Sequence, residues 1–200
     1  MTDADKRDRI IAAAYTVLSE KGYDKASTKE IAATAGVAQG LINYYFPSKD
    51  LLFAEVFRRE TKKYCDSFNP LLEASGNPDE ISNATIAQML EIPKSKALQH
   101  QDWFRLRFEL FAIGLRKESA TATLREMLAT ERGHISETIE SLSGFPPEQS
   151  ETIASILYAV FEGLGLQKVA DPDFNYDEAY DTLAVMLGAY YEFVSKKRES

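Results

Sequence analysis

The fold of this 200-residue chain is decided by the stretch from Ser27 to Leu52, which reads STKEIAATAGVAQGLINYYFPSKDLL. Ser27 stands three residues before Glu30, a spacing typical of the capping box that opens a helix. Gly36 then permits a tight turn, because glycine adopts left-handed backbone angles at little cost. The stretch therefore predicts two short helices, one on each side of this glycine, with the second running from about residue 38 to residue 44.

Longer helices are expected on both sides of this pair. Apolar residues recur at helical spacing from Ile10 to Leu18, and Gly22 provides a suitable C-terminal cap. The residue before Pro47 disfavours helical geometry, and Ser48 is a good first cap for the helix that follows. Two short helices joined by a glycine-containing turn are typical of a helix-turn-helix, whose second short helix enters the major groove of DNA.

The second short helix carries hydrogen-bonding side chains that packing does not explain. Gln39 and Asn43 lie four residues apart on one face, and both amides can donate to and accept from base edges or phosphates. Gly40 between them lets the backbone approach the duplex. Hydroxyl groups and helix starts complete the expected DNA-binding set: Ser27, Thr28, Lys29, Tyr44, Tyr45 and Lys49. The alternative is a helical hairpin with surface amides and half-buried tyrosines.

The segment from about Arg9 to Val56 resembles the DNA-binding domain of the TetR/AcrR family of transcriptional regulators. The resemblance rests on an ordered series of motifs: Ile10 to Ala14, Gly22-Tyr23, Ser27 to Ala32, Ala35-Gly36-Val37, Gly40, Tyr45-Phe46 and Ser48 to Leu51. The family often has Ser or Thr where Ala38 stands, Tyr where Asn43 stands and His where Tyr45 stands. Its operator sequence is therefore not transferable to this chain.

The resemblance implies an all-α fold in two domains. Residues 1–50 would form the helix-turn-helix DNA-binding domain, and residues 51–200 a helical domain that binds an effector and dimerises. It also implies a homodimeric regulator, more often a repressor than an activator, which a small molecule releases from a palindromic double-stranded DNA operator. The alternatives are an architectural DNA-binding protein without an effector and a helical enzyme. A ligand-dependent change in DNA affinity would separate a regulator from an architectural protein.

Helical patterning continues through the rest of the chain. One apolar face extends from Phe53 past Phe68 and Leu71 toward Ala74, where Gly76-Asn77-Pro78 interrupts it. Further helix breaks are expected near Pro93, around Glu118-Ser119, from Gly144 to Pro147 and from Asp171 to Asp173.

The segment from Gln101 to Lys117 places a charge on an apolar helix face. Arg105 and Glu109 share one side, whereas Arg107 lies in the opposite arc with aromatic residues four positions before and after it. A charge there requires a carboxylate partner, a cation–π stack or an anionic ligand. We expect this helix to line an effector cavity, best matched by a hydrophobic carboxylate, through Trp103, Phe104, Arg107, Phe108 and Phe111.

Two apolar stripes near the C-terminus are candidates for the dimer interface that the resemblance implies. The stripes are Ile153, Ile156, Leu157, Val160 and Leu164, and then Tyr180, Leu183, Leu187, Tyr190 and Val194. The same stripes are consistent with closing the core of a single chain. The Gly-x-Gly at Gly163 is not a nucleotide-binding fingerprint, because no strand precedes it and no third glycine follows.

Composition excludes several classes of protein. A hydrophobic content of 44% and a charged content of 27% indicate a globular chain of one or two domains. No apolar run approaches the roughly 20 residues of a membrane span, and no signal-peptide core follows the charged N-terminus, so a cytoplasmic protein is expected. Residues 1–60 contain nine basic and nine acidic side chains, so the net charge of −8 lies entirely in residues 61–200. A positive DNA-facing surface remains compatible with this distribution.

Catalytic and metal sites are not indicated. Cys65 is the only cysteine and has no neighbouring ligand at metal spacing, while His100 and His134 are isolated. The sequence contains no nucleophile elbow, zinc-protease motif or phosphate-binding loop. We therefore expect no catalytic residue, no cofactor and no metal site.

Overall fold

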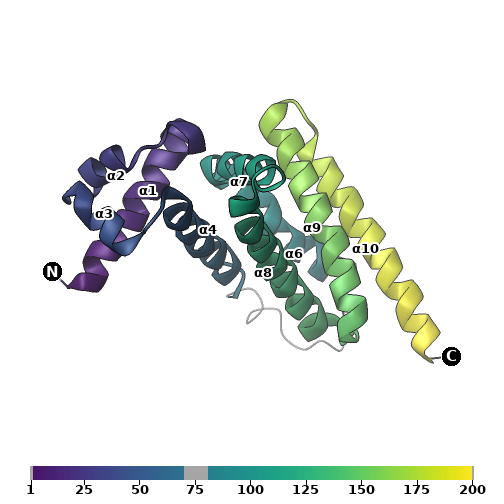
Figure 1. Ribbon diagram of the computed structural model, residues 1–200. Coiled ribbons are helices and arrows are strands. Elements are labelled where there is room, and N and C mark those ends of the chain that lie inside the picture. The colour runs from purple at the N-terminus through teal and green to yellow at the C-terminus, as the bar shows by residue number, and fades with distance from the viewer. Residues whose placement is uncertain (1, 70–80, 200) are drawn as a thin grey trace. The chain divides into compact units, whose positions relative to one another are not determined.

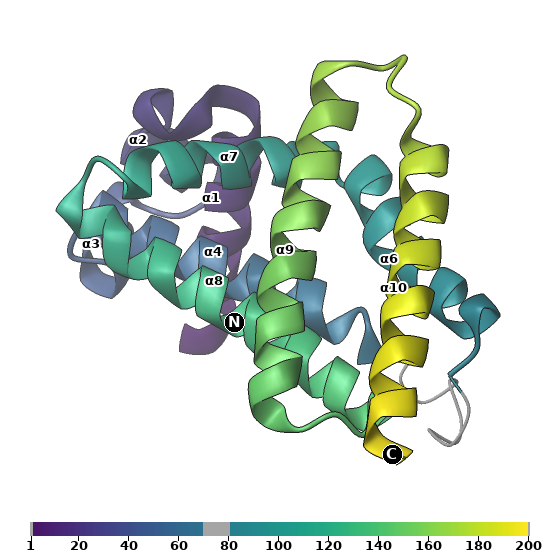
Figure 2. The ribbon, with the colours of Figure 1, turned by 90° about the vertical axis from the view of Figure 1, so that its right-hand side faces the viewer.

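A computed structural model describes residues 2–69 and 81–199, and every regular element in these ranges is an α-helix (Figure 1, Figure 2). The elements are α1 (Asp3–Lys25), α2 (Thr28–Ala35), α3 (Gln39–Tyr45), α4 (Lys49–Asp66), α6 (Asn83–Gln99), α7 (Gln101–Gly114), α8 (Glu118–Ser143), α9 (Pro147–Ala170) and α10 (Tyr176–Glu199). The predicted all-α fold is confirmed. The predicted extension of the apolar face through Leu71 to Ala74, and the break at Gly76-Asn77-Pro78, lie outside the described residues.

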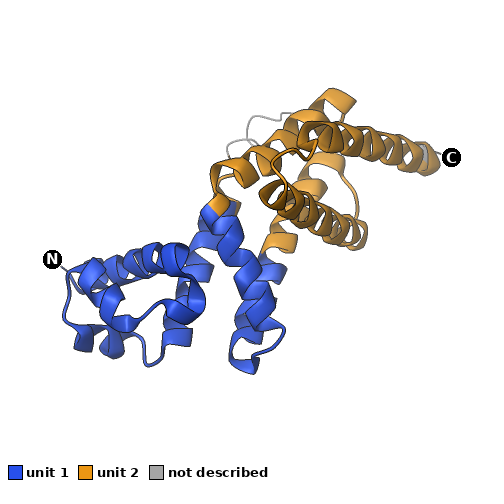
Figure 3. Ribbon diagram, turned by 90° about the horizontal axis from the view of Figure 1, so that it is seen from above, with its two compact units in different colours: residues 1–64, 102–130 blue, residues 65–101, 131–200 orange. Residues whose placement is uncertain are grey.

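The helices form two compact units (Figure 3). The first unit comprises residues 1–64 and 102–130, and the second comprises residues 65–101 and 131–200. The first unit therefore contains α7 and the beginning of α8 in addition to the helix-turn-helix. The domain boundary predicted at residue 50 separates a DNA-binding part from an effector-binding part, whereas the two units are defined by packing. That boundary stays a prediction.

Local signals fix the first helix of the helix-turn-helix unit. α1 begins earlier than its apolar period suggests, because Thr2 and Asp5 form a reciprocal capping box at its start. Gly22, the predicted end of this helix, instead interrupts it with φ +75° and ψ 172°, and the C-cap is Ala26, whose N–H donates to the Gly22 carbonyl over 3.2 Å. The last residues up to Lys25 continue helically beyond this interruption.

The two short helices follow the sequence closely. The predicted capping box joins Ser27 and Glu30 at the start of α2, and Gly36 ends that helix in the left-handed region with φ +63°. α3 starts at Gln39 without a side-chain cap, and Pro47 follows its end. The Ser48 hydroxyl then accepts the Leu51 N–H over 3.2 Å, which confirms the predicted cap of α4.

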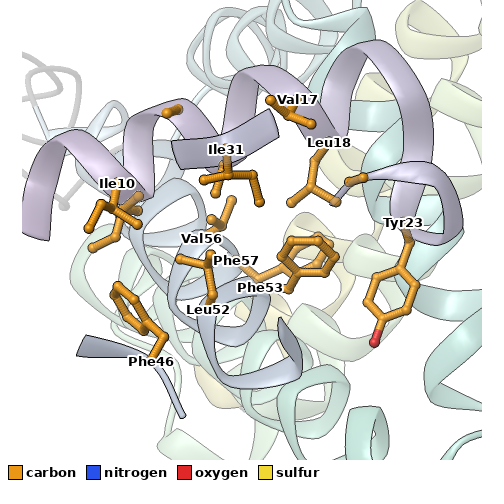
Figure 4. Packing of buried hydrophobic residues seen from close by; sticks show 14 of the residues in the cluster. Ile10, Val17, Leu18, Tyr23, Ile31, Phe46, Leu52, Phe53, Val56 and Phe57 are labelled. Carbon is orange, nitrogen blue, oxygen red and sulfur yellow. The ribbon is translucent and has the colours of Figure 1, made fainter. Parts of the chain in front are cut away.

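One apolar core holds the first unit together (Figure 4). α4 contributes Leu52, Phe53, Val56 and Phe57, each at most 2% exposed. α1, α2 and α3 pack against this face through side chains that include Ile10, Leu18, Ile31 and Ile42, while Trp103, Leu106 and Leu110 of α7 belong to the same cluster. Burial of this many large apolar side chains is the main favourable contribution to folding.

The second unit packs α6 against α9 and α10. The predicted break near Pro93 is wrong, since Pro93 lies inside α6. Proline removes one backbone donor from a helix, but Pro93 is buried, and packing of the surrounding turn offsets that loss. Gaps between helices at residues 144–146 and 171–175 confirm two of the other predicted breaks. The third break lies at residues 115–117, just before the predicted Glu118-Ser119, which begin α8.

One helix among the described residues, α9, is long and apolar enough to cross a membrane by length and composition alone. Its most apolar window has a mean hydropathy of 1.3, and only 17% of that window is buried. Core helices pass the same test, but they are mostly buried. α9 therefore presents an apolar surface that the rest of the single chain does not cover.

The capping box at Ser27 yields a first prediction. Ser27→Ala removes the acceptor for the Glu30 N–H and should lower the free energy of unfolding by about 1 kcal/mol, measured by urea denaturation. Thr16→Ala is the matched control, because it removes an exposed hydroxyl from the middle of α1 and should change stability by less than about 0.5 kcal/mol. Equal stabilities for the two variants would contradict a capping role.

Candidate functional site

The outer surface of α3 is exposed to solvent. Gln39, Gly40, Asn43 and Tyr44 are all exposed, and Tyr44 reaches 74% exposure. Ile42 is the residue that α3 buries in the core. The helix is thus anchored on one side and presents two amides, a glycine and a phenol on the other.

Gly40 has no structural requirement for glycine inside the chain. A Cβ added there would meet nothing within 4 Å, and its backbone does not adopt positive φ. The lack of a side chain at Gly40 would therefore affect only the approach of another molecule. This geometry fits close approach of a nucleic-acid backbone.

The residues at the start of α2 differ in their availability. The Ser27 hydroxyl is occupied in the capping box, where it also donates to Glu30 over 2.8 Å. Thr28 is half-buried and accepts a hydrogen bond from the Gln39 amide over 3.4 Å, which links the two short helices. Lys29 is exposed. Of these three predicted DNA contacts, Lys29 is therefore the most accessible.

Tyr45 points away from the exposed face of α3. Its hydroxyl donates to the Asp3 carboxylate at the start of α1, and this hydrogen bond raises the pKa of Tyr45 to about 12. Tyr44 and Tyr45 meet edge to face with ring centroids 5.1 Å apart. Tyr45 thus braces α3 against α1, whereas Tyr44 projects into solvent.

The Lys49 side chain contacts other residues of the protein and is only partly exposed to solvent. Its ammonium donates to the Tyr23 carbonyl over 2.5 Å and lies 5.0 Å from the centre of the Tyr23 ring and 5.1 Å from that of Phe53. Burial lowers the pKa of Lys49 below its ordinary value. A phosphate contact by Lys49, which the sequence predicts, would have to compete with this carbonyl.

The predicted effector residues lie together on α7, within the first unit. Trp103, Phe104 and Arg107 are buried, and Phe108 and Phe111 are half-buried. Arg107 is 0% exposed, and its guanidinium carbon lies 5.3 Å from the Phe104 ring centre, 5.4 Å from Tyr64 and 5.9 Å from Trp103. The expectation of a buried arginine among aromatic rings is confirmed.

The rings around Arg107 differ in part from those that helical spacing predicts. Phe104 and Tyr64 contribute to the ring cluster, whereas the predicted neighbour Phe111 packs edge to face on Phe108 at 5.6 Å. Tyr64 comes from α4, and helical periodicity within one segment cannot reveal a ring from another helix.

A small hollow lies elsewhere in the first unit, between α4 and α8. Its volume is about 120 Å³, and it is lined by Phe57, Arg58, Thr61, Thr123, Glu126, Met127 and Thr130. None of the predicted effector residues borders it. The hollow is therefore separate from the aromatic cluster on α7.

The residues of the predicted interface stripes on α9 and α10 differ in their exposure to solvent. Leu157, Tyr180 and Leu183 are buried within the single chain, so they are core residues. Ile153, Val160, Leu164, Leu187 and Val194 are half-buried, while Ile156 and Tyr190 are exposed. The exposed apolar surface also includes residues that the sequence did not single out: Leu166, Val185, Met186 and Phe193.

Comparison with known proteins agrees with the architecture around α3. Residues 10–56 match the family model described as bacterial regulatory proteins, tetR family. The chain is 26% identical over 171 residues to the HTH-type transcriptional regulator PksA of Bacillus subtilis, covering 85% of this chain and 82% of PksA. It is also 26% identical over 198 residues to the HTH-type transcriptional regulator BetI of Vibrio atlanticus, covering 97% and 96% of the two chains. Residues 10–56 belong to the TetR family.

Solved structures share the fold of this chain. A transcriptional regulator from Pseudomonas aeruginosa superimposes with a TM-score of 0.77 at 19% identity, over 98% of this chain and 95% of that one. The multidrug binding protein EbrR, solved with imidazole, superimposes with a TM-score of 0.69 at 22% identity, over 90% and 89% of the chains. Together with the family match, the exposed α3 identifies a DNA-binding transcriptional regulator and not an enzyme.

The exposed face of α3 yields a second prediction. Gln39→Ala should weaken binding to the preferred DNA sequence by about 1 to 3 kcal/mol and relax preference at particular base pairs, because an amide that reads a base edge is lost. Lys29→Ala should instead weaken binding to all sequences alike and lower the salt slope by about one unit. Affinity measured against specific and unrelated duplexes over a salt series separates the two effects.

The control is Lys25→Ala, which removes another exposed lysine from the first unit without touching α2 or α3. Unchanged specificity in a folded Gln39→Ala variant would remove Gln39 from the base-reading residues.

Proposed function

We propose that this regulator is a homodimeric repressor that acts in the cytoplasm and leaves a palindromic DNA operator when a small molecule binds. The observation that carries the proposal is the exposed recognition helix α3, seated on a buried core that also contains α7. The DNA-binding set remains Ser27, Thr28, Lys29, Gln39, Gly40, Asn43, Tyr44, Tyr45 and Lys49. Within it, Gln39, Asn43, Tyr44 and Lys29 are the most accessible.

Dimerisation is supported by an apolar surface on α9 and α10. Met186, Tyr190 and Phe193 follow one another at helical spacing on α10 and are all exposed, as are Ile156 and Leu166 on α9. A Cβ at Gly163 would meet nothing within 4 Å, so a partner helix could approach closely there. An exposed apolar surface of this kind is typical of an interface that another subunit covers.

Two subunits are also what operator binding requires. A single helix-turn-helix covers one half-site, and two recognition helices must lie about 34 to 36 Å apart, or a multiple of the helical repeat, to read two. Symmetric pairing through α9 and α10 would present two copies of α3 to a palindrome.

We propose that the effector binds at the α7 cluster of Trp103, Phe104, Arg107, Phe108 and Phe111. Aromatic walls with one fixed charge are typical of small-molecule sites, and a buried guanidinium favours an anionic group. A hydrophobic carboxylate is therefore the proposed class of effector. A fold neighbour at 19% identity is the fatty acid degradation regulator FadR from Bacillus halodurans, with a TM-score of 0.67.

Release from the operator would follow from linkage. An effector that favours a dimer with wrongly spaced recognition helices weakens operator binding. The operator weakens effector binding by the same coupling free energy, typically about 1 to 3 kcal/mol. The direct test is capture of genomic DNA fragments by the protein, followed by competition with candidate carboxylates. Specific binding that no small molecule weakens would instead support an architectural protein.

The dimer proposal yields a third prediction. Met186→Arg or Phe193→Arg, at 63% and 67% exposure, should produce folded monomers with poor operator affinity, because a charge would be buried in the interface. Leu115→Arg is the matched control, since Leu115 is 81% exposed at the end of α7 and should leave the dimer intact. Sedimentation velocity at micromolar concentration provides the measurement. A wild-type monomer with full operator affinity would exclude the proposed assembly.

The effector proposal yields a fourth prediction. Arg107→Met retains length without charge, so it should weaken the response to hydrophobic carboxylates while leaving the response to uncharged ligands unchanged. If Arg107 has only a structural role, the same change should lower the melting temperature and leave ligand response intact. Melting temperature and ligand-induced operator release, measured on the same preparation, decide between the two roles.

A further inference from the structure

Tyr23 connects the end of α1 to the start of α4. It is buried, and its ring meets that of Phe53 edge to face with centroids 4.9 Å apart (Figure 4). Its hydroxyl donates to the Asp50 carboxylate, and its carbonyl accepts the Lys49 ammonium over 2.5 Å. Lys49 and Asp50 form the first turn of α4, directly after the recognition helix and Pro47. Tyr23 therefore fixes the chain where α3 is joined to α4.

α7 contacts the same residue through one carboxylate. The Tyr23 N–H donates to Glu109 Oε2 over 2.9 Å. The other carboxylate oxygen lies 2.5 Å from the position that a Cβ on Gly22 would occupy. Glycine at this position therefore serves two purposes: it permits φ +75°, and it leaves room for the Glu109 side chain.

This hydrogen bond depends on the break in α1. Within an uninterrupted helix the Tyr23 N–H would donate to a backbone carbonyl four residues earlier. The non-helical angles at Gly22 turn that N–H toward α7, where a charged acceptor makes a stronger hydrogen bond than a neutral one. Lys117, in the connection between α7 and α8, approaches the same ring, with its ammonium 5.2 Å from the Tyr23 ring centre.

α7 thus has two contacting faces within the first unit. One carries Trp103 and Arg107 into the aromatic cluster, and the other carries Glu109 to the Gly22-Tyr23 corner. A displacement of α7 along or about its axis would pull on Tyr23 and, through it, on Lys49 and Asp50.

We infer that Glu109 is a positioning residue for DNA binding, which holds the Gly22-Tyr23 corner and thereby sets the orientation of α3. The inference rests on the proposed function, because it assigns to α7 the step that connects effector binding to the recognition helix. Glu109 belongs neither to the proposed DNA-binding set nor to the rings around Arg107. It acts through the backbone of Tyr23.

Contacts that remain without Glu109 indicate that the fold would persist. The Ala26 N–H would still donate to the Gly22 carbonyl, and Tyr23 would keep Asp50, Lys49 and Phe53 as partners. Because Glu109 is exposed apart from this contact, its removal should affect orientation more than stability.

The fifth prediction compares Glu109→Ala with Asp102→Ala. Both variants remove one exposed acidic side chain from α7, so both change the net charge equally. Loss of a negative charge by itself strengthens binding to DNA. Glu109→Ala should nevertheless weaken affinity for the selected operator about five- to tenfold while leaving affinity for unrelated duplexes within about twofold of wild type. Asp102→Ala should bind the operator at least as well as wild type.

Amide hydrogen exchange provides a readout that does not require an operator. In free Glu109→Ala, amides of residues 36–52 should exchange faster than in wild type, with a melting temperature unchanged within about 2 °C. A double-mutant cycle with Gly22→Ala adds an independent check. Gly22→Ala should cost operator affinity in wild type and less in the Glu109→Ala background, because the clash with the carboxylate is gone while the φ strain remains.

The outcomes separate this inference from the proposed function. Failure of the wild-type protein to select any DNA sequence would overturn the proposed function, and the exchange measurement would still decide the role of Glu109. Unchanged exchange at residues 36–52 together with unchanged operator affinity would overturn the inference. A fall in melting temperature with unchanged operator specificity would likewise reduce Glu109 to a structural contact.

Discussion

The burial of one face of α4 is the constraint on which the first unit depends. Leu52, Phe53, Val56 and Phe57 are almost completely removed from solvent, and α1, α2, α3 and α7 all belong to the same apolar cluster. α3 has only seven residues and no side-chain cap, so it is too short to be stable alone. Its helical form is maintained because Ile42 docks into a core that α4 supplies. The orientation of the DNA-reading surface is therefore a property of this core as a whole.

The parts of the fold that could be predicted from the sequence are those that neighbouring residues specify. The Ser27–Glu30 capping box, the left-handed Gly36 and the Ser48 cap each involve groups within three residues of one another, and the structure shows all three. The burial of Arg107 was also predictable, because helical spacing alone placed it among apolar residues. At such positions local preference and tertiary packing agree.

The features that could not be predicted depend on partners distant in the chain. Pro93 continues a helix because packing in the second unit outweighs a local preference. Periodicity identified apolar faces on α9 and α10, but it could not show that Leu157, Tyr180 and Leu183 turn inward while Val185, Met186 and Phe193 turn outward. Glu109 appeared to be an ordinary polar residue, because its partner is a backbone N–H 86 residues away in the sequence. The sequence predicts a phosphate contact for Lys49, but it gives no sign that the Lys49 ammonium donates to the Tyr23 carbonyl.

The residues of α3 that stabilise the helix differ from those that face solvent, and this has a consequence for how such a regulator evolves. Stability of the helix depends on Ile42 and on the rings at its C-terminal end, whereas Gln39, Gly40, Asn43 and Tyr44 contribute little to the core. Substitutions at these exposed positions are therefore nearly neutral for folding. After gene duplication, a copy of this protein could acquire a new operator sequence through a few changes in α3, without compensating mutations elsewhere. In this architecture, DNA specificity can change without a loss of stability.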